Sequence, residues 1–518
     1  MTILKSDFLK LFFLCSLSFI LFLPFINKAV SGDSIFYIYT ARQILKQPLR
    51  PFDFRINCAD KEYPAWDVAN NPPAVSYLLA GIIKIFGENE KILHIVFFCF
   101  ALLSVIALYF LSNELKIDPF VSALLLIASS AFFVNATDIM LDIPLLAFSL
   151  WGIYFAIREK YLGWFLLGIA ILIKFVAVIY LPIIFVWFLL NKKLKKNFAL
   201  FLIPVLFLIA WSLQNKLIYG EIQILKKSSA VGLFFGPVKE IPLLTYIGGT
   251  FIFPLSILWI AFSLGKRFVW GSVIIFTVAD FLFSLLGYPA PQNFLFALFI
   301  SCAAILIFII IEKTKSAGFG KDFLFLSIWF FCFFGFFASI SAITAVRYLI
   351  PALPAAVMIF AKISETIPVR KVFLTVTAAA GIFLSVFISS SDYALANSYR
   401  DVARYIKINY ADKNVYFTGH LGFQYYMEKN GFLAVDSANK KYPRDSILVV
   451  PVLPVPQKID ESVLNKARVI EERYVTTVNP FRTMSPSAQA GFHLNLYGLL
   501  PYSLSKTPLE KFTIYKIR

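Results

Sequence analysis

The sequence predicts a polytopic α-helical membrane protein that carries a C-terminal α/β domain outside the membrane. Apolar residues make up 59% of the 518-residue chain and charged residues only 15%, so a soluble fold could not hide its apolar surface. Apolar runs of about 20 residues, the length that crosses a bilayer, recur up to residue 390. Residues 391–518 instead mix short helix and strand patterns, which predicts a separate α/β domain.

The formal charge of +18 does not indicate a nucleic-acid-binding protein. Most lysines and arginines flank the apolar runs, as they do where cytoplasmic loops of membrane proteins are enriched in positive charge. We therefore expect no nucleic-acid partner. The chain is predicted to be a multi-pass protein of the inner or plasma membrane.

Eleven apolar runs each predict one spanning helix, and a twelfth run over 162–190 is too long for one helix. Basic residues flank both ends of that run, so both ends are expected in the cytoplasm and the run is predicted to be a hairpin with Lys174 near its outer turn. The total is about thirteen helices, with a cytoplasmic N-terminus and an extracytoplasmic C-terminal domain. The eleven runs are 8–27, 91–112, 119–134, 141–157, 198–217, 242–264, 269–287, 294–312, 323–345, 348–362 and 372–390.

The chain is thus predicted to have a transmembrane module, 1–390, and a soluble domain, 391–518. The module includes a polar outer loop over 28–74, an interfacial helix over 75–87 and a second outer loop over 218–241. In the soluble domain we expect a helix near 394–409 and strands near 414–418, 432–435, 446–450 and 512–517.

Three acidic residues lie near the predicted outer ends of helices and are candidates for chemistry. Asp33 follows the first helix in "SGDSIFYIYTA", and Asp138 and Asp142 lie in "NATDIMLDIPLLAF". Acids at helix starts can simply be caps, and Asp33 can be a solvated loop acid. An ionisable group just inside a membrane helix is, however, a functional candidate by default.

Two basic residues lie at the same predicted level. Lys174 is in the apolar hairpin, and Arg347 begins a helix in "RYLIPALP", followed by Tyr348. Either residue could reach up to lipid head groups. Alternatively, they form a clamp for a phosphate that arrives through the membrane, because arginine binds phosphate in two-pronged geometry and lysine supplies a point charge.

Histidine is scarce, with only His94, His420 and His493. Three scattered histidines do not predict a transition-metal site, although a carboxylate site for Mg²⁺ or Mn²⁺ stays possible. No certain cofactor is expected. The sequence has no P-loop, so transport driven by ATP is not indicated.

The order of these motifs resembles the GT-C membrane glycosyltransferases, in the branch of protein O-mannosyltransferases and the lipid A aminoarabinose transferase. The likeness rests on the outer-loop acid in "GDSIFYIYTA", the "NNPPAVSYLLAGIIKIFG" segment, the acid in "LDIPLLAF" and the lysine in "GIAILIKFVAVIYLP". The segments "RYLIPALP" and "VYFTGHLGFQYY" are similar to bacterial members. Relatives often carry a charged residue directly before the two prolines, where this chain has Asn71.

The resemblance implies an inverting glycosyltransferase that uses a sugar carried on a polyprenyl phosphate. It implies Asp33 as general base, and Asp142 as a residue that positions the acceptor or base or binds a metal. Lys174 and Arg347 would bind the donor phosphate. Asp138, Asn71, Tyr348 and His420 are further candidates. The acceptor would be a lipid, glycan or protein of the cell envelope.

Two other function classes stay open at this stage. A lipid or glycan flippase is one, but transporters usually show repeated halves, which we do not find in this sequence. An O-antigen polymerase or ligase is the other, and it would add many sugars in place of one.

Overall fold

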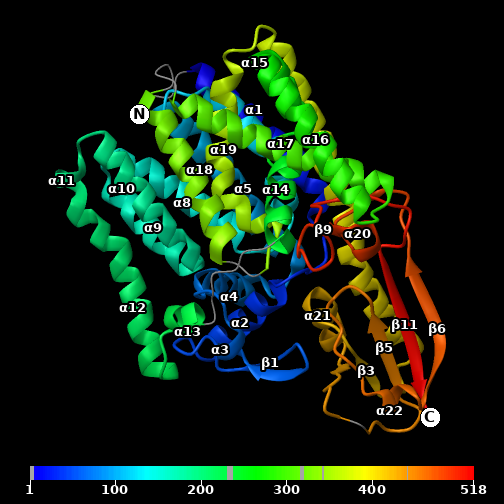
Figure 1. Ribbon diagram of the computed structural model, residues 1–518. Helices are drawn as coiled ribbons and strands as arrows, with labels where there is room; N and C mark the ends of the chain where they lie inside the picture. Colours follow the sequence, from blue (N-terminus) through cyan, green and yellow to red (C-terminus); the bar gives the residue numbers. More distant parts are fainter. Residues whose placement is uncertain (1–4, 230–236, 316–319, 341–342, 440) are drawn as a thin grey trace.

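The computed structural model describes residues 5–229, 237–315, 320–340, 343–439 and 441–518. It consists of a large helical part and a smaller C-terminal part that contains the main sheet (Figure 1). The described residues hold eight helical segments long and apolar enough to cross a membrane, and two bent helix pairs raise the number to ten. The eight segments contain α1 (Lys5–Phe22), α5 (Glu90–Glu114), α12 (Leu202–Tyr219), α16 (Lys266–Leu285), α17 (Ala290–Lys315), α18 (Gly320–Ile340), η4 (Val346–Ala352) with α19 (Leu353–Ser364), and α20 (Arg370–Asn409).

Two predicted spans are broken rather than straight. The run predicted over 119–134 forms α6 (Pro119–Ala128) and α7 (Ser130–Ala136), bent by 65°. The run predicted over 242–264 forms α14 (Pro237–Thr250) and α15 (Pro254–Leu264), bent by 83°. Ser129 has extended backbone at the first break, and at the second break the proline at the start of α15 cannot continue the preceding helix.

The remaining three predicted spans are apolar but shorter, namely α8 (Asp142–Ile157), α9 (Tyr161–Ile173) and α10 (Tyr180–Leu190). With them, the helices of all thirteen predicted spans are present in the predicted order. The polytopic helical fold class is confirmed. By length alone, these three helices are short for a full crossing.

The predicted hairpin is present in the structure. Its legs are α9 and α10, joined by η2 (Phe175–Ile179), and Lys174 begins the turn. The two ends of the hairpin opposite its turn meet, because Glu159 before α9 accepts hydrogen bonds from Lys193 at 2.7 Å and Lys196 at 2.6 Å. The rings of Trp164 and Phe188 lie 6.0 Å apart between the legs.

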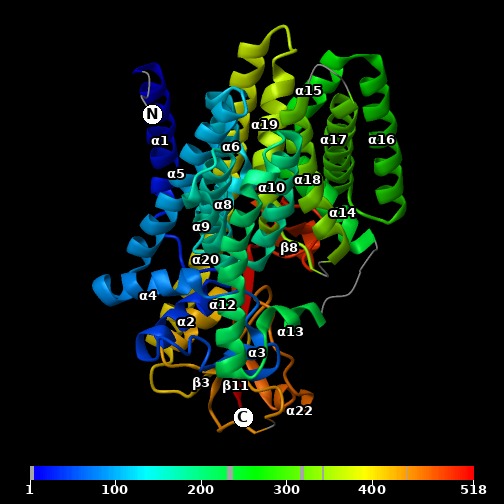
Figure 2. The same cartoon turned by 90° about the vertical axis from the view of Figure 1, so that its left-hand side faces the viewer.

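The first outer loop folds into α2 (Ser34–Lys46), the hairpin of β1 (Arg55–Cys58) and β2 (Lys61–Pro64), and α3 (Ala65–Val68). The predicted interfacial helix is α4 (Ala74–Phe86), which lies across the direction of the spanning helices (Figure 2). Short helices complete the module: η1 (Leu23–Phe25), α11 (Leu194–Asn197), η3 (Phe198–Phe201) and α13 (Gln223–Ser229). The part of the second predicted outer loop over 230–236 lies outside the described residues.

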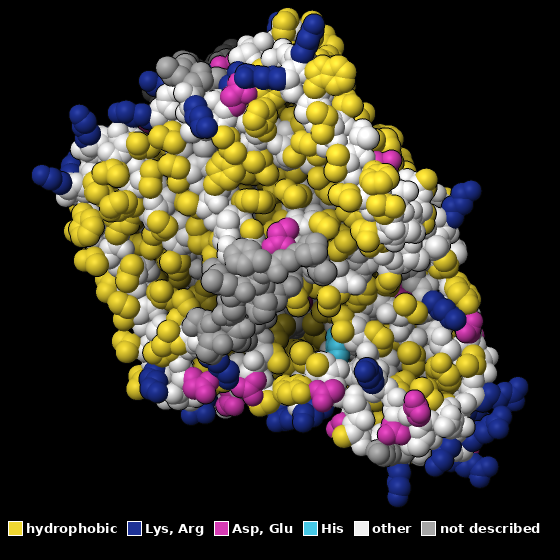
Figure 3. All heavy atoms as spheres, in the orientation of Figure 1, with side chains coloured by type: hydrophobic (Ala, Val, Ile, Leu, Met, Phe, Trp, Pro, Cys, Tyr) yellow, Lys and Arg dark blue, Asp and Glu magenta, His cyan; other side chains and the backbone are white. Residues whose placement is uncertain are grey.

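The N-terminus and the C-terminal part lie at opposite ends of the helical bundle, and α2, α3 and β1 lie at the C-terminal end (Figures 1 and 2). Figure 3 shows hydrophobic side chains across the flank of the bundle, while lysine and arginine gather toward its two ends. This is the distribution of a protein whose middle is in contact with lipid.

The C-terminal part is built on a five-stranded mixed sheet of order β4-β3-β5-β11-β6. Strand β3 pairs in parallel with β4 and β5, and β11 pairs antiparallel with β5 and β6. Rings from α20, α21 and β11 pack together on the sheet, with Phe423 5.8 Å from Tyr399 and 5.5 Å from Phe512. The elements are β3 (Val415–Phe417), α21 (Leu421–Lys429), β4 (Leu433–Ala434), β5 (Ile447–Pro451), α22 (Glu461–Leu464), β6 (Ala467–Val475), β7 (Phe481–Arg482), β8 (Met484–Ser485), η5 (Pro486–Ala488), β9 (Ala490–Gly491), β10 (Ser503–Leu504) and β11 (Glu510–Ile517).

The separate helices expected over 372–390 and near 394–409 form one helix, because α20 continues through residues 391–393. The polar residues there are bonded rather than solvated. The hydroxyl of Ser390 donates to the Val386 carbonyl within the helix, the hydroxyl of Ser391 donates to the Phe481 carbonyl, and Asp392 binds Lys28. One 40-residue helix therefore connects the membrane module to the sheet.

Candidate active site

Asp33 lies directly before α2, at the end of a short loop that follows η1. Gly32 precedes it with φ of +53°, a left-handed conformation that glycine adopts without strain. The carboxylate of Asp33 accepts a hydrogen bond from Arg347 in η4 at 2.8 Å. The Asp33 side chain is 41% exposed and that of Arg347 only 12%, so the acid remains open to a ligand.

Asp142 and Lys174 form a second ion pair, at 2.8 Å. Asp142 is the first residue of α8, where the helix dipole favours a negative charge, and it is buried. Lys174 comes from the turn of the α9–α10 hairpin and is 14% exposed. The pair thus joins the start of α8 to the turn after α9, between two residues that are 32 positions apart in sequence.

Tyr348 connects the two ion pairs. The Lys174 ammonium lies 4.9 Å from the centre of its ring, and the Arg347 guanidinium lies 5.4 Å from it. Both cations are attracted by the ring face. Tyr37 of α2 lies near these ion pairs. Burial, followed by the charge of Asp33, raises the pKa of its phenol well above the usual value.

The loop that carries Asp33 is held by the C-terminal part. The backbone N–H of Ala29 donates to the Asn397 side chain at 2.9 Å, and that of Val30 donates to the Tyr426 hydroxyl at 2.8 Å. Gly422 at the start of α21 lies so close that an added Cβ would be 2.1 Å from the Val30 carbonyl oxygen. Helices α20 and α21 therefore fix the backbone three residues before Asp33.

A buried cluster of charged side chains around Lys28, called the Lys28 cluster, also holds the loop that carries Asp33. The Lys28 ammonium lies 2.6 Å from Oδ1 of Asp138 and 2.7 Å from Oδ2 of Asp392, and its side chain is fully buried. His493 Nε2 lies 2.8 Å from Oδ1 of Asp392. Burial works against the charge of Lys28, but the two carboxylates raise its pKa above the ordinary value.

A cavity lies between the membrane module and the C-terminal part. Asp33, Arg347, Asp138, Asp392 and His493 are among its lining residues, together with apolar side chains of both parts. Two of the lining residues, Leu421 and Val455, have φ of 61° and 48°. Left-handed backbone at leucine and valine is strained, and such strain gathers at functional sites.

The sequence-predicted candidates divide into three groups. Asp33, Asp142, Lys174, Arg347 and Tyr348 come together as described. Asp138 lines the cavity but belongs to the Lys28 cluster.

Asn71 and His420 make contacts of another kind. The Asn71 carbonyl accepts a hydrogen bond from Gln223, and the His420 ring bonds to the Ala59 carbonyl, which ties α21 to the first outer loop. Burial lowers the pKa of His420. Roles for these residues in catalysis stay predictions.

Lys28, Asp392 and His493 were not among the predicted site residues. Lys28 resembles any basic residue that flanks a spanning helix, and Asp392 lies in the polar stretch that we expected to end a helix. No short motif joins these three positions, because 364 residues separate Lys28 from Asp392. Only the tertiary fold brings them together.

Residues 70–214 match the family model described as dolichyl-phosphate-mannose-protein mannosyltransferase. The matched segment contains Asp138, Asp142 and Lys174 but not Asp33 or Arg347. Among curated proteins, no sequence matches this chain.

Two solved structures are similar in chain path. One is ArnT from Cupriavidus metallidurans bound to undecaprenyl phosphate, with 14% identity and a TM-score of 0.41 over 90% of this chain and 97% of that one. The other is the Archaeoglobus fulgidus oligosaccharyltransferase tethered with an acceptor peptide, with 12% identity and a TM-score of 0.46 over 82% of this chain and 63% of that one.

The predicted resemblance to membrane glycosyltransferases is therefore confirmed, on the family match. Over residues 70–214, the chain is similar to the dolichyl-phosphate-mannose-protein mannosyltransferase family.

Proposed function

We propose that this protein is an inverting glycosyltransferase that moves a sugar from a polyprenyl phosphate to an acceptor of the cell envelope, on the outer side of the membrane. The observation that carries the proposal is the pairing of Asp33 with Arg347 and of Asp142 with Lys174 around Tyr348. A transfer of this kind needs one base for the acceptor and cations for a leaving phosphate, and both are present here.

In the proposed reaction the acceptor hydroxyl gives its proton to the carboxylate of Asp33. The acceptor oxygen then forms a bond to the anomeric carbon as the bond from that carbon to the phosphate oxygen breaks. The electron pair of the broken bond leaves with the polyprenyl phosphate. One displacement of this kind inverts the anomeric centre.

Arg347 and Lys174 are proposed to hold the leaving phosphate. The contact with Asp33 occupies one nitrogen of the Arg347 guanidinium, which has five N–H donors in all, so the group can bind a second anion. Lys174 can likewise turn part of its hydrogen bonding from Asp142 to a phosphate. A lipid-linked donor can approach through the bilayer, which suits a site formed where the spanning helices end.

The direct test uses the full chain in lipid nanodiscs with a panel of polyprenyl-phosphate monosaccharides. Mass spectrometry would follow the release of free polyprenyl phosphate. We expect one or a few donors to be consumed, and Arg347→Ala to slow their release strongly. Arg50→Ala, which removes an exposed arginine of the first outer loop, is the matched control and should behave as wild type. A folded protein that neither binds nor consumes any donor of the panel would overturn the proposal.

A further inference from the structure

The Lys28 cluster contains more negative than positive charge. Asp138 and Asp392 contribute two carboxylates and Lys28 one ammonium, and Asp138, Asp392 and Lys28 are all nearly or fully buried. An uncompensated charge in such a place is costly. The cluster therefore leaves one carboxylate charge that a further cation can bind.

The carboxylate oxygens that Lys28 does not contact indicate a metal ion as this cation. Lys28 binds Oδ1 of Asp138 and Oδ2 of Asp392. Oδ2 of Asp138 is buried and has no hydrogen-bond partner among the described residues. The His493 ring contacts Asp392 and not this oxygen of Asp138. A water molecule could bond to that oxygen but would not balance the charge.

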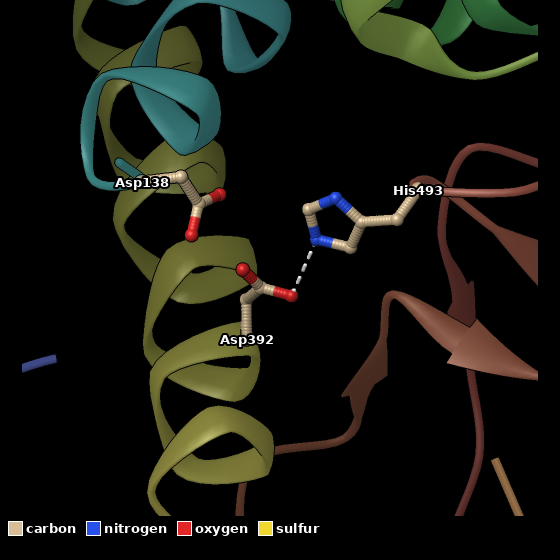
Figure 4. Close-up of side chains that lie close together, drawn as sticks. All are labelled: Asp138, Asp392 and His493. Atoms are coloured by element: carbon tan, nitrogen blue, oxygen red, sulfur yellow. Dashed lines mark hydrogen bonds and ion pairs between the residues drawn. The ribbon is translucent and has the colours of Figure 1, made fainter. Parts of the chain in front are cut away.

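We propose that Asp138, Asp392 and His493 form a binding site for a divalent transition metal of the Mn²⁺ or Zn²⁺ type. The three side chains come from the turn between α7 and α8, from α20 and from the C-terminal part, and they converge on one point (Figure 4). One ligand atom of each lies within 4.8 Å of the others. Ligands of such an ion are about 2.0–2.2 Å from it, so opposite ligands are about 4.4 Å apart at most, and small side-chain rotations close the site.

The donor set determines the class of metal. One imidazole nitrogen with two carboxylate oxygens suits Mn²⁺ or Zn²⁺ better than Mg²⁺ or Ca²⁺, which prefer oxygen alone. The site joins the membrane module to the C-terminal part and borders the cavity that contains Asp33. Bound metal should therefore also stabilise the contact between the two parts.

The test is metal binding itself, which does not depend on the proposed glycosyl transfer. The full-length protein in nanodiscs is treated with EDTA, dialysed and titrated with Mn²⁺ under electron paramagnetic resonance. In parallel, protein dialysed against Zn²⁺ is analysed by elemental mass spectrometry. We expect about one ion per chain, and a higher melting temperature for the metal-loaded protein.

His493→Ala should weaken binding at least tenfold, and His493→Gln provides a second variant in case the first does not fold. His420→Ala is the matched control, since it removes the other histidine of the C-terminal part, and it should bind metal as wild type does. Failure of the wild type to bind either ion in stoichiometric amount would overturn the proposal. Equal affinity in a folded His493 variant would overturn it as well. If metal binds but no donor is consumed, only the proposed function fails.

Discussion

Two groups of charged side chains in this protein are built alike but differ in burial. The Lys28 cluster is closed, with its lysine at 0% exposure and its aspartates at 3% and 5%. In the pairs around Tyr348, Asp33 is 41% exposed and Lys174 is 14% exposed. A fully buried pair cannot exchange partners without leaving a bare charge, whereas a pair with a partly exposed member can share its groups with a ligand. We infer that the first group fixes the loop before Asp33 and that the second binds substrate.

The largest effect is expected from Asp33→Asn, which removes the proposed base but keeps the shape of the side chain. A general base contributes roughly 10²–10⁴-fold, so sugar transfer should fall by that factor. The measurement is the rate of polyprenyl phosphate release, with melting temperature as the check on folding. Asp53→Asn, at an exposed acid of the same outer loop, should leave the rate unchanged. A wild-type rate in folded Asp33→Asn would rule out this residue as the base.

Lys28→Met disrupts the Lys28 cluster. It leaves two buried carboxylates without their ammonium, a change that typically costs about 3–5 kcal/mol. We expect a clearly lower melting temperature and poor expression. Lys226→Met, at a lysine paired with acids on the surface, is the comparison and should cost less than about 1 kcal/mol. Equal stability of the two variants would contradict the structural role of Lys28.

Lys174→Ala removes one cation from the ion pairs around Tyr348. The fold should tolerate it better than Lys28→Met, because Lys174 is partly exposed and only one carboxylate, that of Asp142, loses its partner. Loss of a hydrogen bond between charged groups is worth about 1.5–3 kcal/mol, so the KM for the lipid-linked donor should rise roughly 10- to 100-fold. Initial-rate kinetics at varied donor concentration measure this. An unchanged KM would place the phosphate elsewhere.

A substitution at Glu510 is expected to have a smaller effect, on the pH dependence of stability. The carboxylate of this residue is buried and bonded mainly to backbone groups. It accepts hydrogen bonds from the N–H groups of Val452 and Leu453, and burial raises its pKa from 4.5 to about 7. The native state then keeps a proton that the unfolded chain loses, so the stability contributed by this group is full below pH 4.5 and is lost as pH rises through 7.

Glu510→Gln removes this titration, so its melting temperature relative to wild type should increase from pH 5 to pH 8. Thermal unfolding followed at several pH values measures the trend. A constant difference between the two proteins across that range would show that the pKa of Glu510 is not raised.

The sequence was sufficient to place the apolar helices in order, because apolar runs and flanking charges follow directly from the bilayer, but it did not predict the two breaks within them. It also predicted Asp33, Asp142, Lys174 and Arg347, because a charge at the end of an apolar run stands out. It did not predict strand β6, whose residues Ala467–Val475 alternate charged and apolar side chains along a largely exposed edge. Nor did it predict the Lys28 cluster, whose members are joined only by packing between the bundle and the C-terminal part.

The most direct test of the distinction between the Lys28 cluster and the ion pairs around Tyr348 is an experimental structure of the protein in nanodiscs with bound polyprenyl phosphate. We predict that the phosphate lies within hydrogen-bonding distance of Lys174 and Arg347, with at least one of their two ion pairs to Asp142 and Asp33 opened. The contacts of Lys28 with Asp138 and Asp392 should be the same as without ligand. A phosphate bound away from both cations, or a Lys28 cluster that rearranges while the pairs around Tyr348 stay closed, would contradict the account.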